Sequence, residues 1–324
     1  MIKQPSEITT MNKKVRLLIA GYPGISKTTT ALSAPKPLLI DVDKGIDRVA
    51  AQYRQPFIQP ETYEELLDDL TVENLKEYET LIFDTGGQLL KLMAEWAKRQ
   101  NTANVQRDGS LSLKGYGVVG REFENLMNKA YYELNRNVVV IFHAKEEKEG
   151  DIFKLRILVE GQTKDNVWQP MDLGGFIEIQ NNKRVITFSN TERHFGKCCH
   201  GIPASIVIPQ LNENSPNNFL TWLFNLVNEN IRKEAERCEK MKSEYADVIV
   251  EIVEIINTIT DNKTAKKAGE KLKKLDHRLT SLTESQVMFR RKLEELNLKY
   301  DKGSGDYIAK SNKSESAVSD AQSA

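Results

Sequence analysis

The sequence lacks a long hydrophobic run and a surplus of charge of either sign. Among 324 residues, lysine plus arginine and aspartate plus glutamate each number 46. Because equal charges give no overall positive field, any nucleic-acid binding must come from local patches. No apolar run approaches the ~20 residues of a membrane helix, and the first residues, MIKQPSEITTMNKK, contain no signal-peptide core. We therefore expect a cytoplasmic protein that does not bind membranes.

Cysteine is also scarce, with three in the whole chain. Cys198 and Cys199 are adjacent and are flanked by His194 and His200, which suggests a zinc site at first sight. Adjacent residues of a strand point to opposite faces, however, and the chain contains no C-x-x-C pair. The cysteines are therefore interpreted as reduced structural thiols.

The most informative segment present reads LLIAGYPGISKTTT, an apolar strand followed by a glycine-containing loop and a helix start. It follows the phosphate-binding pattern G-x-x-x-x-G-K-[ST] except at Ser26, which replaces the second glycine. Lys27 would reach the β- and γ-phosphates of ATP, and the hydroxyl of Thr28 would hold Mg²⁺. The alternative is an ordinary strand–turn–helix. The residues predicted to bind nucleotide are Gly21, Tyr22, Pro23, Gly24, Ile25, Ser26, Lys27, Thr28 and Thr29.

Two further apolar strands end in carboxylates. Asp84 ends the run LIFD and is predicted to bind Mg²⁺ together with Thr28; capping of the following turn is the alternative. Hydrolysis also requires a carboxylate that orients or deprotonates water. The candidates are Asp41 and Asp43, at the end of the strand PLLIDVD.

Changes in hydrophobic pattern and composition along the chain predict four regions. Alternating strand and helix patterns indicate an α/β fold with a mainly parallel sheet flanked by helices over 13–226, after an N-terminal arm at 1–12. Region 227–300 is predicted to form a helical hairpin or bundle, because apolar residues recur with 3-4 spacing from 238 to 282. Region 301–324 has almost nothing to bury and is predicted to be disordered.

These motifs resemble the RecA-like P-loop ATPases over about residues 13–210. Asp43 occupies the position of the family's catalytic acid, there usually glutamate, and residues 79–85 resemble its Walker B strand. His143, which ends the strand VVVIFH, corresponds to the family's γ-phosphate sensor; a strand-end histidine hydrogen-bonded to the backbone is the alternative. The chain looks most like phage-encoded RecA-type (AAA/RecA) ATPases of the single-strand annealing and recombination group. The resemblance implies ATP and Mg²⁺ binding, assembly into homo-oligomers, and work on single-stranded DNA with a single-strand-binding protein, in the host cytoplasm.

The same resemblance assigns DNA-binding loops to residues 99–119, which include Tyr116, and to residues 144–175; solvated surface loops are the alternative for both segments. In the family, residues at the positions of Arg193 and Lys197 can reach the nucleotide of a neighbouring subunit. Independently, the lysine-rich stretch 263–278 could follow a phosphate backbone, although a solvated helix face is the alternative.

Two other functions fit the sequence. One is a nucleotide-dependent loader or assembly protein that binds a protein partner through its heptad helices and never contacts DNA. The other is a P-loop protein that binds nucleotide without efficient turnover, because Ser26 replaces glycine and Asp43 is one methylene shorter than glutamate. The sequence leaves the choice between ATP and GTP open.

Overall fold

The computed structural model describes residues 12–159 and 166–310, which belong to two compact units. The first, called here the α/β unit, extends to Arg232, and the second, the helical unit, begins at Lys233. The sequence predicted this boundary six residues earlier. The predicted N-terminal arm, apart from its last residue, lies outside the described residues.

The α/β unit is built on a mainly parallel sheet of strand order β3-β2-β4-β5-β1-β7-β8-β9, with β6 paired to β5. Both neighbours of β1, and both neighbours of β4, run parallel to it. Beyond β7, the pairings of β7 with β8 and of β8 with β9 are antiparallel. The bounds are β1 (Arg16–Gly21), β2 (Pro37–Asp41), β3 (Phe57–Ile58), β4 (Thr80–Asp84), β5 (Asn137–Glu149), β6 (Ile152–Ile157), β7 (Leu173–Gln180), β8 (Lys183–Thr187) and β9 (Ser205–Val207).

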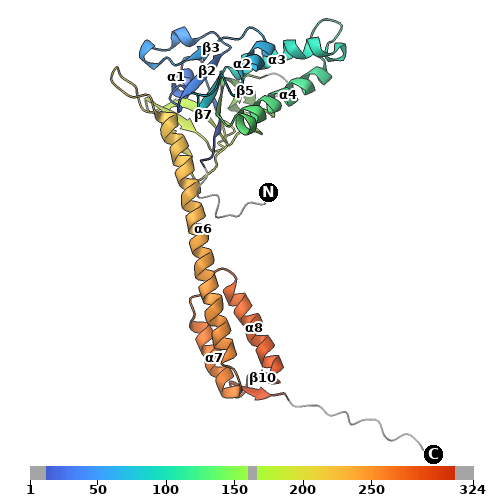
Figure 1. Cartoon of the computed structure of the whole chain (residues 1–324), viewed down its shortest axis with the longest axis vertical. Helices are drawn as coiled ribbons and strands as arrows, with labels where there is room; N and C mark the ends of the chain where they lie inside the picture. The colour runs from blue at the N-terminus through green and yellow to red at the C-terminus, as the bar shows by residue number, and fades with distance from the viewer. Residues whose placement is uncertain (1–11, 160–165, 311–324) are drawn as a thin grey trace, which may run out of the picture. The chain divides into compact units, whose positions relative to one another are not determined.

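The continuous apolar runs of these strands are explained by helices on both faces of the sheet. On β1, Leu18 and Ala20 join the core beneath α2, α3 and α4, whereas Leu17 and Ile19 join the core beneath α1 and the first turns of α6 (Figure 1). The helix bounds are α1 (Lys27–Ala31), α2 (Tyr63–Asp69), α3 (Gly86–Gln100), α4 (Leu113–Asn128) with a π-helical continuation (Lys129–Glu133), and α6 (Phe219–Asn257).

Helix α4 begins six residues before the predicted 119. Its start is fixed by Ser112, whose hydroxyl accepts a hydrogen bond from the backbone N–H of Gly115. As a result, Tyr116 lies on a helix and packs against the core rather than standing in a loop. The connection between α3 and α4 is therefore shorter than the loop predicted over 99–119, because α3 ends at Gln100 and α4 begins at Leu113.

The helical unit contains the end of α6, α7 (Asn262–Lys274) and α8 (Ser281–Glu295). A capping box formed by Asp261 and Thr264 starts α7. Heptad residues of α6, of the turn that follows it and of α7 form the core, including Ile252, Ile259 and Leu272. The predicted helical hairpin is therefore present. In the part of the chain that the structure describes, no helix is long and apolar enough to cross a membrane.

The heptad pattern overestimates the length of the second helix. Leu279 and Leu282 continue the 3-4 spacing, but they are 60% and 48% exposed, because α7 ends at Lys274 and Leu279 adopts φ +49° in the following turn.

Order also continues past Asp301, where disorder was predicted to begin. Strands β10 (Leu298–Asp301) and β11 (Asp306–Ala309) pair in a hairpin. The rings of Tyr300 and Tyr307 lie 5.3 Å apart across this hairpin. The rest of the predicted tail, residues 311–324, lies outside the described residues.

Candidate functional site

The predicted site residues lie at one end of the parallel sheet. Gly21 of β1 is in register with His143 of β5, and Asp41 of β2 is in register with Asp84 of β4. Parallel strands of a covered sheet bring their carboxyl ends to one edge, where ligands bind. The strand that carries His143 lies between the P-loop strand and the strand that carries Asp84.

The loop from Gly21 to Ser26 contains two left-handed residues. Gly24 has φ +79°, and Ser26, immediately before α1, has φ 62° and ψ 37°. Ser26 therefore occupies a conformation that glycine adopts freely and that costs another residue about 1–2 kcal/mol. Its side chain makes no capping hydrogen bond, although its carbonyl oxygen accepts from the N–H and hydroxyl of Thr30.

Close packing explains the first glycine. A Cβ atom at Gly21 would lie 2.9 Å from the carbonyl oxygen of Ile177 on β7. Glycine therefore allows the end of β1 to remain against β7 while the chain turns into the loop.

Lys27 is a buried cation, with 5% of its surface exposed. Its Nζ donates to the carbonyl oxygen of Tyr22 at 2.8 Å and lies 3.4 Å from His143 Nδ1. Burial lowers the pKa of Lys27 to about 8, against the opposing effect of Asp84 and Asp43. A bound polyphosphate would restore the stabilisation that the ammonium group loses on burial.

Thr28 and Asp84 form a pair of oxygen ligands. The Thr28 hydroxyl donates to Asp84 Oδ2 at 2.5 Å. Burial, with smaller contributions from the neighbouring Asp41 and Asp43, raises the pKa of Asp84 to about 6, against the lowering effects of the Thr28 hydrogen bond and Lys27. A divalent cation bound at this carboxylate would offset the desolvation, so the donor set fits Mg²⁺.

Asp41 and Asp43 differ in their surroundings. The Asp41 carboxylate accepts from the backbone N–H groups of Gly45 and Ile46 and from Gln59 Nε2, so it holds the following turn. Among the described residues, the ion-pair partner of the Asp43 carboxylate is the exposed Arg48, at 3.2 Å. Asp43 is also tied to the site, because its backbone N–H donates to the carbonyl oxygen of Asp84 at 3.0 Å.

His143 is half-buried beside Lys27. Burial, and secondarily Lys27, lower the pKa of the imidazole, so the ring is neutral at neutral pH. Since lysine only donates, the contact assigns the acceptor role to Nδ1 and leaves the proton on Nε2.

A hollow of about 360 Å³ lies beside the loop, lined by Tyr22, Gly24, Glu178 and Arg193 among others. The Arg193 guanidinium pairs with Glu146 at 3.2 Å and with Glu178 at 3.3 Å. That Arg193 can reach the nucleotide of a neighbouring subunit, as the resemblance implies, stays a prediction; within its own chain Arg193 lines the hollow beside the P-loop.

Sequence reasoning missed the two glutamates around Arg193. Burial and a hydrogen bond with Glu146 raise the pKa of the Tyr22 hydroxyl. Glu146 lies three residues beyond His143 on β5 and Glu178 lies on β7. The sequence carried no motif that marks them, because their position depends on strand pairing. Lys197 lies apart from this hollow and bonds to the carbonyl oxygens of Trp168 and Gln169.

The predicted DNA-binding loop over 144–175 begins as a hairpin of β5 and β6. Its cations are largely paired within the hairpin: Lys154 and Arg156 share Glu149, and Lys145 pairs with Glu147. In the other predicted loop, Arg99 pairs with Glu64 of α2. Residues 160–165 lie outside the described structure.

The lysine-rich stretch 263–278 coincides with α7 and the turn that follows. Lys266 pairs with Asp306, and Arg278 pairs with Asp276 and Glu244. Lys267, Lys271 and Lys274 are exposed, and within the described chain they have no ion-pair partner. This exposed face retains an unneutralised positive charge.

A family model described as an AAA domain matches residues 13–199, which include the P-loop, Asp84 and His143. No curated protein matches the chain.

Proposed function

Because the chain belongs to the AAA domain family, we propose that it is a Mg²⁺-dependent ATPase whose turnover is linked to single-stranded DNA. The observation that carries this proposal is the convergence of Lys27, the Thr28–Asp84 pair and His143 at one sheet edge. A role in annealing or recombination, as a homo-oligomer with a single-strand-binding protein, is part of the same proposal and is motivated by the resemblance to RecA-like proteins.

In this proposal the loop from Gly21 to Thr29 binds the triphosphate. Lys27 contributes its ammonium group to the β- and γ-phosphates. Thr28 and Asp84 would hold Mg²⁺, which supplies positive charge to the phosphate oxygens. The Ser26 side chain does not cap the backbone N–H groups at the start of α1, so these donors are left for the phosphate oxygens.

Asp43 is proposed to orient the attacking water and to accept its proton as the water oxygen bonds to the γ-phosphorus. The bond from that phosphorus to the β–γ bridging oxygen breaks, and ADP leaves with the electron pair. His143 donates from Nε2 to a γ-phosphate oxygen. The carboxylate of Asp41 already accepts three N–H donors, which favours Asp43 for the water.

A link to DNA is supported by the continuity of β5. One strand carries His143 within the site and then runs, from Lys145 to Glu149, into the hairpin that it forms with β6. A change in the contacts of His143 would therefore act directly on the hairpin. The partner-loading alternative would use exposed heptad residues. Ile252, Ile259 and Leu272 are buried in the helical unit itself, whereas Met241, Leu279 and Leu282 are exposed, so this alternative keeps a smaller apolar surface.

The pH dependence of ATP affinity is expected to have an optimum between about pH 6 and about pH 8 in the presence of Mg²⁺. Above the pKa of Lys27 the free protein loses the ammonium group that ATP requires, so affinity falls by up to about tenfold per pH unit. Below the pKa of Asp84 the carboxylate is protonated and binds Mg²⁺ less well. Titration with a fluorescent ATP analogue at several pH values measures the loss of affinity above the pKa of Lys27 and the loss below the pKa of Asp84. Constant affinity through pH 8 would contradict the role of Lys27.

The proposed function is tested by the rate of ATP hydrolysis with and without single-stranded DNA. We expect Mg²⁺-dependent turnover that single-stranded DNA stimulates and double-stranded DNA of the same length does not. Turnover that ignores DNA would support the partner-loading function instead. ATP binding without turnover under either condition would indicate that nucleotide is a structural or regulatory ligand.

A further inference from the structure

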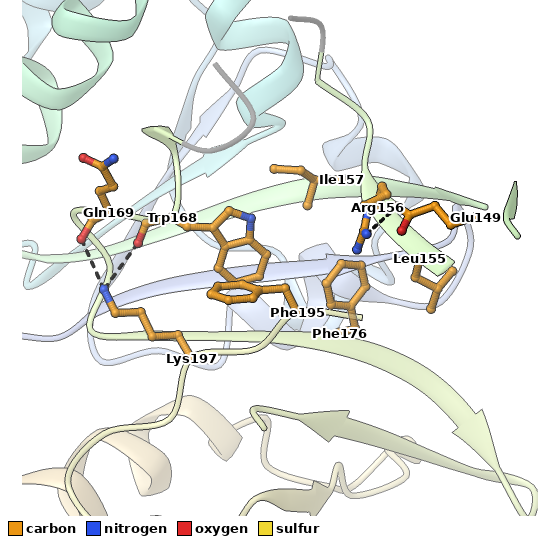
Figure 2. Close-up of a pocket in the computed structure, with 9 residues that line it drawn as sticks. All are labelled: Glu149, Leu155, Arg156, Ile157, Trp168, Gln169, Phe176, Phe195 and Lys197. Atoms are coloured by element: carbon orange, nitrogen blue, oxygen red, sulfur yellow. Dashed lines mark hydrogen bonds and ion pairs between the residues drawn. The ribbon is translucent and has the colours of Figure 1, made fainter. Parts of the chain in front are cut away.

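A second, larger pocket lies in the α/β unit, separate from the P-loop residues. It has a volume of about 640 Å³ and is bounded by the hairpin strand β6, by β7 and by the segment that includes Phe195 and Lys197 (Figure 2). Such a volume is within the range of small-ligand sites. The ATPase chemistry proposed above uses none of the residues that line it.

Three aromatic rings form the pocket wall. The Trp168 ring is stacked on Phe176, with centroids 6.2 Å apart and an interplanar angle of 25°, and Phe195 meets it edge-on at 5.1 Å. Phe176 is almost fully buried, whereas Phe195 is 48% exposed at the opening. The wall therefore combines a fixed base with a ring that a ligand can reach.

The position of Trp168 depends on a glycine. A Cβ atom at Gly174 of β7 would lie 2.3 Å from the Trp168 ring. The indole can therefore lie flat against the strand only because this residue has no side chain. Such an arrangement holds the ring in place and pre-organises the pocket.

Cations flank the aromatic wall on both sides. Arg156 pairs with Glu149, but this carboxylate is shared with Lys154, so one positive charge remains. Among the described residues Lys197 has no carboxylate partner, and its Nζ donates to the carbonyl oxygens of Trp168, at 3.4 Å, and Gln169, at 3.2 Å. In Figure 2, Arg156 and Lys197 lie on either side of Trp168 and Phe195.

The sequence of the segment that joins β6 to Trp168 does not favour it as the occupant of the pocket. Residues 160–165, outside the described structure, read EGQTKD and contain no large apolar side chain. An aliphatic ligand would use the aromatic wall but not the cations. A planar ring joined to phosphates on both sides would use both features.

We propose that this pocket receives one unstacked base of a single-stranded nucleic acid, with the flanking phosphates at Arg156 and Lys197. Phe195 stacks on the base at the opening, and Trp168 forms the wall behind it. This inference rests on the proposed binding of single-stranded DNA and assigns that binding to a specific site. In this proposal the β5–β6 hairpin contacts the nucleic acid directly, and its strand β5 also carries His143.

The first test uses Trp168 as a reporter in the full chain. Trp96 and Trp222, the other tryptophans, are replaced by phenylalanine. Addition of a thymidine oligonucleotide is expected to quench the remaining fluorescence in parallel with binding measured by anisotropy. Anisotropy that reports binding without any change at Trp168 would overturn the pocket assignment and leave DNA binding intact. Absence of binding at low salt with ATP present would overturn the proposed link to DNA as well.

The second test combines a protein change with a DNA change. Phe195→Ala is expected to weaken oligonucleotide binding by roughly ten- to a hundredfold, the range for loss of one stacked base. An abasic oligonucleotide, which keeps its phosphates, should bind the parent protein as weakly, and Phe195→Ala should weaken it no further. Equal weakening of normal and abasic strands by Phe195→Ala would show a backbone or folding effect and overturn the inference.

Two matched variants accompany these measurements. Phe57→Ala removes a phenylalanine of almost the same exposure, 47%, on β3 at the far end of the sheet, and should leave DNA affinity unchanged. Lys197→Gln should reduce the salt dependence of binding by about one unit of slope, because one phosphate contact is lost. An unchanged salt dependence of binding would contradict the phosphate contact assigned to Lys197.

Discussion

Lys27→Ala is expected to raise the dissociation constant for ATP by about a hundredfold or more. The ammonium group is the buried cation of the P-loop, and a hydrogen bond to a charged group contributes up to about 3 kcal/mol, or roughly two powers of ten. Because burial disfavours the charged form of Lys27, the free protein should not be destabilised by its removal. Calorimetric titration with ATP and Mg²⁺ measures the loss of affinity.

Thermal unfolding provides the control for this prediction. ATP with Mg²⁺ should raise the midpoint of the parent protein through preferential binding to the folded state, and should leave that of Lys27→Ala unchanged. Ser26→Gly, which relieves a left-handed residue in the same loop, should bind ATP at least as well as the parent. Equal ATP affinity of Lys27→Ala and the parent would refute the P-loop assignment.

The site could be predicted wherever it depends on residues adjacent in the sequence or on strand ends. Lys27 and Thr28 belong to one loop, and Asp84 and His143 each stand at or near the end of a continuous apolar run, which marks a buried strand. Asp41 and Asp43 could not be distinguished in this way. The two carboxylates differ in their hydrogen-bond partners. Asp41 accepts from Gln59 Nε2 and from backbone N–H groups of the turn after β2.

The α/β fold was predictable from the alternation of strand and helix patterns, and it is present. Features set by packing were not. The aromatic pocket exists because Gly174 accommodates Trp168, and that contact joins segments without a shared motif. Likewise, Leu279 and Leu282 satisfy the heptad spacing but lie after the end of α7, so periodicity alone could not exclude them from the core.

Asp43→Asn is expected to lower the maximal rate of ATP hydrolysis by about 10²- to 10⁴-fold, the usual contribution of a positioned general base. Affinity for ATP and Mg²⁺ should change little, because the carboxylate contacts neither Lys27 nor Thr28 directly; its side-chain partner is Arg48. A loss of turnover without a loss of binding identifies a group that acts in the transition state. Single-turnover hydrolysis at saturating ATP separates this effect from product release.

Three variants distinguish this role of Asp43 from a general loss of negative charge. Asp41→Asn weakens acceptors that hold Gly45 and Ile46, so it should lower the thermal midpoint, an effect that Asp43→Asn should not show. Asp84→Asn should reduce the Mg²⁺-dependent part of ATP binding, because Asp84 faces Thr28. Arg48→Gln should leave hydrolysis largely intact, since the exposed ion pair with Asp43 contributes little. Normal turnover by Asp43→Asn, with Asp41→Asn inactive but folded, would transfer the water-orienting role to Asp41.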